Sequence, residues 1–343
     1  MTNYLYFPSI KAFAKQVIDF YRRGDFSALK ECREYLENSN NVKGICGDSK
    51  DFHDAVKHFE SCDFFDYAYG VAEIGHNYYP DDPVLLGDLL ECGMRCRVSD
   101  SELFRWNELL TAQKDRWKWP WTVFFISFNY QLERQNDSVA TLDLIRSFKE
   151  MSSRPDIEKA YIMEYRYYRA IHDDRQAIAA LVEAINLFPN NCCQCSLIYA
   201  EYLYTCRRYG EAAENIQRAI YNTGVSPTID MGRAYYLLAI SLEAQARERQ
   251  ALTDNSLIEK IYTAYAGACF YFKLNRDGII KIRDELKPRI EFLEIETKIE
   301  SNILKNLNLN FSDQVLCTPQ YVGSKGLFSS YYDTIDDHRL TLN

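Results

Sequence analysis

The sequence predicts an all-α protein built as an α-solenoid of antiparallel helix pairs. Its 343 residues include only 14 glycines and 9 prolines, which leaves few places for tight β turns. Apolar residues recur at helical spacing along most of the chain, as Ile10, Phe13 and Val17 do near its start. Small and large apolar residues also return in a fixed order, as expected of repeats that bury their apolar faces only by stacking.

Three segments share landmarks at the same offsets from a first small residue, namely 0, 4, 7 and 12. They are 49–80 (Ala68, Ala72, Gly75 and Pro80), 158–189 (Ala177, Leu181, Ala184 and Pro189) and 193–224 (Ala212, Ile216 and Ala219, without the final proline). Each landmark set is preceded by an apolar stripe typical of another helix. The three segments therefore predict three helix–turn–helix units, and the remaining units are assigned by continuation.

These landmarks resemble those of the tetratricopeptide repeat, in which small residues let two helices approach closely and a proline closes the unit. Ala177 and Ala212 are 35 residues apart, close to that family's period of about 34. The resemblance implies a right-handed superhelix whose first helices line a concave groove for an extended peptide or a partner helix. We expect this array over residues 1–305. Residues 306–343 form an irregular tail, rich in apolar side chains, that we expect to dock on the array or on a partner.

Composition excludes several classes of partner and location. A formal charge of -9 argues against non-specific binding of nucleic acid or anionic lipid, which requires a basic surface. The longest apolar stretch is far shorter than the roughly 20 residues that span a bilayer, so no membrane association is expected. The 11 cysteines are scattered and odd in number, and the N-terminus lacks the pattern of a signal peptide. We therefore expect reduced thiols and a cytoplasmic protein.

Motifs for catalysis or cofactor binding are missing, so the protein is not expected to be an enzyme and no cofactor is predicted. The segment 44–50, GICGDSK, has the wrong glycine spacing for a phosphate loop. Cys192, Cys193 and Cys195 cluster, but a structural zinc site needs four ligands and no second cysteine pair lies at a matching spacing. No metal site is predicted.

The resemblance assigns particular first-helix positions to the groove. They are Lys50, His53, Lys57, Lys159, Arg166, Arg169, Glu201 and Tyr204. This set is mostly basic, and local positive charge would attract an acidic or carboxylate-ended ligand. The alternative interpretation is that these lysines and arginines form an ordinary solvated helix face. The asparagines that hold a free carboxyl terminus in some members of the family have no counterparts at matching places.

The function predicted from this pattern is that of a non-catalytic scaffold or adaptor that binds a partner protein or peptide in the groove. Two alternatives stay open: a regulatory receptor that senses a peptide or small ligand, and an accessory subunit of a bacterial effector complex in defence or secretion. A ligand that raises the melting temperature would favour the receptor. A stable co-purifying protein would favour the accessory subunit.

Overall fold

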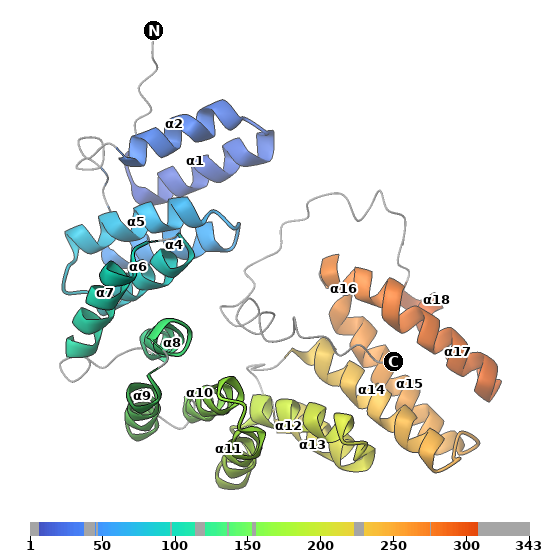
Figure 1. Cartoon of the computed structure of the whole chain (residues 1–343). Coiled ribbons are helices and arrows are strands. Elements are labelled where there is room, and N and C mark those ends of the chain that lie inside the picture. The colour runs from blue at the N-terminus through green and yellow to red at the C-terminus, as the bar shows by residue number, and fades with distance from the viewer. Residues whose placement is uncertain are drawn as a thin grey trace. The chain divides into compact units, whose positions relative to one another are not determined.

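The computed structural model describes residues 7–37, 45, 47–96, 98–113, 121–135, 137–152, 156–222, 230–274 and 276–307. The chain divides into two compact units, residues 1–152 and 153–343. Within the described residues the regular elements are helices and no β-strand occurs, which confirms the all-α solenoid prediction (Figure 1). None of the described helices is both long and apolar enough to cross a membrane.

The first unit is a series of helix pairs. Its helices are α1 (Ile10–Arg23), α2 (Phe26–Glu37), α4 (Ser49–Glu60), α5 (Phe65–Tyr78), α6 (Pro83–Arg95), α7 (Asp100–Gln113), α8 (Trp121–Tyr130), which continues as the π-helical segment η1 (Gln131–Gln135), and α9 (Ser138–Met151). Within each pair the helices pack on each other, and the first helices of consecutive pairs also touch, α1 with α4, α4 with α6, and α6 with α8. This is the contact pattern of stacked repeats.

The second unit follows the same plan. Its helices are α10 (Ile157–Ala170), α11 (Asp174–Leu187), α12 (Cys193–Thr205), α13 (Tyr209–Asn222), α14 (Met231–Glu248), α15 (Asn255–Phe272), α16 (Arg276–Lys281), which continues through the π-helical segment η2 (Ile282–Leu286) into α17 (Lys287–Thr297), and α18 (Ile303–Leu307). First helices again touch in order, α10 with α12 and α12 with α14. The expected tail begins at residue 306, and its residues 308–343 lie outside the described part of the chain.

The sequence landmarks lie on the buried faces of the second helices. Ala68, Ala72, Ala177, Ala184 and Ala212 are all fully buried, on the second helices of their pairs. Pro80 and Pro189 stand just beyond the ends of α5 and α11, where a helix cannot continue through the missing N–H. The three predicted units 49–80, 158–189 and 193–224 therefore each hold one antiparallel helix pair.

Aromatic side chains fill the space between the helices of the first unit. The Phe13 and Phe59 rings lie 6.1 Å apart, and Phe59 stacks on Tyr67 at 5.5 Å. The Tyr67 hydroxyl donates to the Leu29 carbonyl at 2.6 Å, so its polar end is satisfied inside the core. These contacts join α1, α2, α4 and α5, so they fix the place of α4, one of the two helices that carry the network described below.

Aspartate side chains start many of the helices. The Asp82 carboxylate accepts from the backbone N–H of Val84 at 2.8 Å, and Pro83 occupies the first turn of α6. Such a cap contributes about 1 kcal/mol and fixes where a helix begins. Both Asp88 and Glu91 lie within α6. Since they are three residues apart in a helix, they lie on one face of it.

Two glycines of α5 test how closely the helices pack. A Cβ built on Gly75 would lie 3.0 Å from the Phe52 side chain, whereas one on Gly70 would meet nothing closer than Leu36 at 3.4 Å. We expect Gly70→Ala to stabilise the first unit by about 1 kcal/mol through helix propensity. The Gly75→Ala change should lose that gain to overpacking against Phe52. Urea unfolding of both variants measures the difference, and equal stabilisation would contradict the predicted close approach.

Candidate functional site

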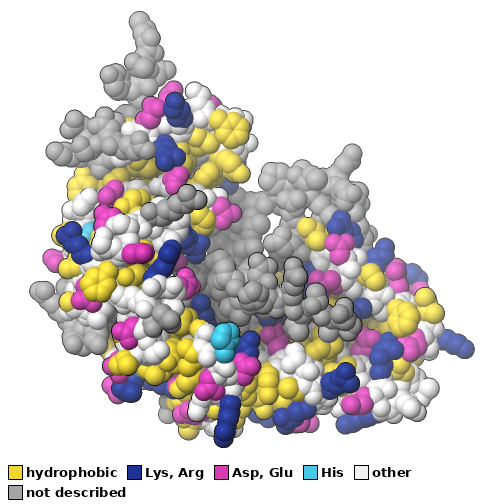
Figure 2. All heavy atoms as spheres, viewed as in Figure 1, with side chains coloured by type: hydrophobic (Ala, Val, Ile, Leu, Met, Phe, Trp, Pro, Cys, Tyr) yellow, Lys and Arg dark blue, Asp and Glu magenta, His cyan; other side chains and the backbone are white. Residues whose placement is uncertain are grey.

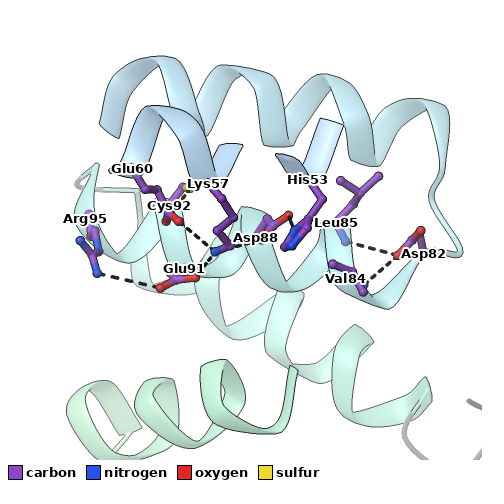
Figure 3. Close-up of polar contacts among 10 residues, drawn as sticks. All are labelled: His53, Lys57, Glu60, Asp82, Val84, Leu85, Asp88, Glu91, Cys92 and Arg95. Atoms are coloured by element: carbon purple, nitrogen blue, oxygen red, sulfur yellow. Dashed lines mark hydrogen bonds and ion pairs between the residues drawn. The ribbon is translucent and has the colours of Figure 1, made fainter. Parts of the chain in front are cut away.

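Two of the predicted groove residues, His53 and Lys57 on α4, point at α6 and join a network of ionisable groups (Figure 3). Lys57 Nζ lies 2.8 Å from Glu91 Oε2 and 3.2 Å from Asp88 Oδ1. It also lies 2.9 Å from Glu60 Oε2, one helical turn along α4. His53 Nδ1 lies 2.7 Å from Asp88 Oδ2. One ammonium group is therefore shared by three carboxylates, and the imidazole extends the network by one group.

The network is largely removed from solvent. The side chains of Asp88 and Glu91 are 1% and 5% exposed, and that of Lys57 is 18% exposed. Carboxylates at such depth are tolerated only when paired, because burying an unpaired charge is costly. The network thus connects the first helices of two consecutive pairs and depends on Lys57 as its shared cation.

Burial and neighbouring charges shift the pKa values in opposite directions. Burial lowers the pKa of Lys57, but the charges of Glu91, Asp88 and Glu60 raise it well above its ordinary value. Burial raises the pKa of Glu60 to about 6, and the nearby charge of Glu91 adds to the effect. Burial also raises the pKa of the Cys92 thiol, whose Sγ donates to Glu60 at 3.5 Å. A thiol held protonated in this way is a poor nucleophile, so the network does not have the chemistry of a cysteine active site.

His53 makes the stability of the first unit dependent on pH. Burial lowers its pKa, but the hydrogen bond and charge of Asp88 outweigh burial and raise it above 6.5, with Asp54 adding to and Lys57 opposing the rise. When the pKa of a histidine is higher in the folded than in the unfolded protein, its charged form stabilises the fold. This stabilisation is complete at a pH below the pKa of the unfolded state and is lost as the pH rises through the pKa of the folded state. We expect His53→Gln to cost more stability at pH 5.5 than at pH 8.5, measured by urea unfolding. A cost that does not change with pH would contradict the predicted charged pair.

The second unit repeats this cross-helix pairing at other predicted residues. Glu201 on α12 binds Arg233 on α14 through two hydrogen bonds, Arg233 Nε donating at 2.6 Å and Nη2 at 2.9 Å. Both side chains are about one third exposed, at 27% and 30%. A bidentate arginine–carboxylate pair fixes geometry as well as charge, so it sets how these first helices meet.

Tyr204, the last predicted groove residue, belongs to a cluster built on α12, α14, α15 and α17. Burial raises the pKa of the Tyr204 hydroxyl, and the nearby Arg289 guanidinium opposes this rise. The same guanidinium lies 3.5 Å from the carboxylate of Glu243. Glu243 also accepts from the Tyr265 hydroxyl at 2.5 Å and from Arg247 at 2.9 Å. Burial raises the pKa of Tyr236, beside Arg289, to about 12. Tyrosines and arginines from three first helices therefore meet around one buried carboxylate.

The other predicted residues are paired locally or lie on the surface. Lys159 Nζ lies 2.7 Å from Asp156, and Arg169 lies 2.5 Å from Asp174. Arg166 is half-buried and Lys50 is exposed. On the face drawn in Figure 2, basic and acidic side chains are interspersed over the described surface. The positive charges of Lys57, Lys159 and Arg169 are therefore each offset by a nearby carboxylate.

Except for Glu201, the carboxylates that complete these sites were not predicted from the sequence. Asp88 and Glu91 interrupt the otherwise apolar segment VLLGDLLECGM, and their spacing of three residues places them on one helix face. Two acids on the buried side of a predicted first helix are the signal that could have found them. Glu243 and Arg289 lie on helices well separated along the chain, and no local spacing connects them.

A shallow hollow of about 330 Å³ lies away from all the predicted residues. Its lining comes from α13, α14 and α15 and includes the apolar Leu238 and Leu242 and exposed polar residues such as Gln217 and Lys260. Among the described residues that line it, none forms a cross-helix ion pair of the kind seen on the first helices. We therefore consider two candidate surfaces separately, one formed by α4 and α6 in the first unit and one formed by α10, α12, α14 and α17 in the second. Each is called the first-helix face of its unit.

No protein-family model matches the chain, and no curated protein matches it. Among solved structures, a human IFIT1 dimer with m7Gppp-AAAA matches at 12% identity and a TM-score of 0.36, over 90% of this chain and 60% of that chain. A monomeric IFIT1 mutant with m7Gppp-AAAA matches at 13% identity and a TM-score of 0.34, with the same coverage. This chain thus spans about 60% of the IFIT1 chains it matches. Neither match bears on what this chain binds.

Proposed function

We propose that this chain is a non-catalytic scaffold that binds a partner protein or peptide on the first-helix face of its second unit. The observation that carries the proposal is that Tyr204, Tyr236 and Arg289 come from three first helices and are each only partly buried. Both tyrosines pack against the core of the second unit, and Arg289 lies near enough to each to oppose the rise that burial causes in its pKa. Tyrosine and arginine are the residue types that most often dominate binding energy at protein interfaces. We also propose that the chain acts as an adaptor in the cytoplasm. The scattered cysteines support this location, because they fit a compartment in which thiols stay reduced.

The chemistry of this cluster fits a peptide that packs an apolar side chain on the rings and hydrogen-bonds to its polar rim. Lys281 Nζ lies 5.4 Å from the Tyr236 ring and 5.3 Å from the Phe272 ring, so the rings are bordered by a cation. Glu243 and Arg289 form an ion pair with each other. The tyrosine rings are therefore the part of this surface that can adjust to a bound peptide. We expect aromatic contact to supply most of the affinity and the charged rim to set orientation.

Selection of a random peptide library against the intact chain tests this function. We expect selected peptides to lose about 30-fold or more in affinity when Tyr204 and Tyr236 are both changed to alanine, as for truncation of interface anchors worth about 2 kcal/mol or more. The matched control is Tyr221→Ala on the second helix α13, where the side chain is 87% exposed. Circular dichroism melting shows whether the double variant is folded.

Two results would overturn the proposal. One is a library that yields no peptide binding the intact chain above background. The other is a set of peptides that keep their affinity for the folded double variant, whether or not they lose it with Tyr221→Ala. A loss with Tyr221→Ala alone would place binding on the second helices.

A further inference from the structure

Two thiols and a carboxylate meet where α12 begins. Cys192 is the residue before α12, Cys195 lies in its first turn, and Glu158 lies in the first turn of α10. One ligand atom of each lies within 4.8 Å of the others, and their side chains are all buried. Glu158 stands one repeat length before Cys192, so the repeat itself brings the carboxylate to the thiols.

The spacing fits a tetrahedral ion. Zinc binds thiolate sulfur at about 2.3 Å and carboxylate oxygen at about 2.0 Å, so tetrahedral ligand atoms are roughly 3.3–3.8 Å apart. Atoms already within 4.8 Å of one another reach that separation by side-chain adjustments of about an ångström. Two cysteines separated by two residues, on one turn of helix, are also the arrangement in which proteins most often supply a pair of zinc ligands.

The Glu158 carboxylate is buried without an ion pair to neutralise it among the described residues. Its Oε1 accepts from the Cys195 N–H at 2.9 Å, and its side chain is 6% exposed. Burial raises its pKa to about 7, opposed in part by hydrogen bonds from the Cys195 and Gln194 backbone and by the charge of Lys159. A buried carboxylate of this kind is unfavourable when charged, and a metal ion beside it would remove that cost.

We infer that Glu158, Cys192 and Cys195 bind one thiophilic divalent cation of the zinc class, with a fourth position left to water. Two thiolates and one carboxylate would bring three negative charges to a doubly charged ion, and the thiols would release their protons on binding. The sequence alone did not predict this site because its third ligand lies on the preceding first helix. The ion would tie α10 to α12, two consecutive first helices, and so stabilise the start of the second unit.

Metal titration of the intact chain tests the inference. The purified protein is stripped with a chelator, kept reduced, and titrated with Co²⁺ and then Zn²⁺. We expect one equivalent of Co²⁺ to produce the thiolate charge-transfer absorption and strong visible bands of a tetrahedral site, and Zn²⁺ to displace it. Cys192→Ser and Cys195→Ser should each abolish the spectrum, and Glu158→Gln should weaken binding about 10-fold or more.

The matched control is Cys193→Ser, which changes the neighbouring buried thiol whose sulfur is not part of the cluster. It should bind Co²⁺ as the wild type does. X-ray absorption of the zinc-loaded wild type needs no variant and should show two sulfur and two oxygen neighbours. The inference is overturned by a stripped wild type that binds no Co²⁺, by a spectrum that survives Cys192→Ser or Cys195→Ser, or by one that Cys193→Ser removes.

Discussion

Replacing Lys57 with methionine is expected to destabilise the first unit by about 3–5 kcal/mol at pH 8, the range for removing one partner from a buried ion pair. Methionine keeps the unbranched shape of the side chain, so the change removes charge more than volume. It leaves the carboxylates of Glu60, Asp88 and Glu91 facing one another without their shared cation. Their mutual repulsion acts at low exposure, where solvent screens it poorly.

Tryptophan fluorescence during urea unfolding measures this loss in the first unit alone. All four tryptophans, at positions 106, 117, 119 and 121, lie within residues 1–152. The control is Lys50→Met, an exposed lysine of the same helix, which should change stability by no more than about 0.5 kcal/mol. Equal losses in the two variants would contradict the role assigned to Lys57.

The loss caused by Lys57→Met should also shrink as the pH falls. A carboxyl with a raised pKa, such as Glu60 at about 6, is protonated in the folded state before it is protonated in the unfolded state. Stability therefore increases as the pH falls through that value, and this gain is larger where the repulsion is larger. We expect the difference between variant and wild type to be smaller at pH 5 than at pH 8, in the same fluorescence assay. A difference that grows on acidification would rule out carboxylate repulsion as its cause.

The fold could be predicted because its signals are local. The repeated offsets place Ala177, Leu181 and Ala184 on one buried helix face and end the unit at Pro189. Helical periodicity shows which helix face is buried from only one or two turns of sequence. The same landmarks return in the next unit, so the repeat gives the same prediction a second time. In the structure the three predicted units hold α4 with α5, α10 with α11, and α12 with α13.

The site was predicted less completely because its pairs join separate first helices. The resemblance placed His53, Lys57, Glu201 and Tyr204 on first helices. The structure pairs the first three with side chains of the next first helix and places Tyr204 near Arg289. It could not supply their partners, since Arg233 and Arg289 lie on later first helices, beyond the reach of any local spacing from Glu201 or Tyr204. The local charge around Lys57 could not be judged from α4 alone for a related reason, because two of the carboxylates that pair with Lys57 lie on the next first helix.

Replacing Glu243 with leucine is expected to destabilise the second unit by about 3 kcal/mol, and the loss should not change between pH 6 and pH 9. Glu243 is 8% exposed, and its removal leaves Arg289, Arg247 and the Tyr265 hydroxyl without their shared acceptor. The estimate of about 3 kcal/mol is at the low end for a broken buried pair, because both arginines are about one third exposed and water can reach them. Guanidinium groups stay charged at any pH at which the protein is folded. A change in pH therefore cannot neutralise the arginines that the variant leaves without their partner.

Hydrogen exchange of α14 and α15 measures this loss, since residues 153–343 contain no tryptophan. The control is Glu296→Leu, which removes the other, more exposed partner of Arg247 and should cost no more than about 1 kcal/mol. Adding Arg289→Leu to Glu243→Leu removes one stranded charge together with its partner, so the double variant should recover part of the loss. Strictly additive losses, or a Glu296→Leu cost as large as that of Glu243→Leu, would mean that Glu243 does not organise the Tyr204 and Arg289 surface on which the proposed binding depends.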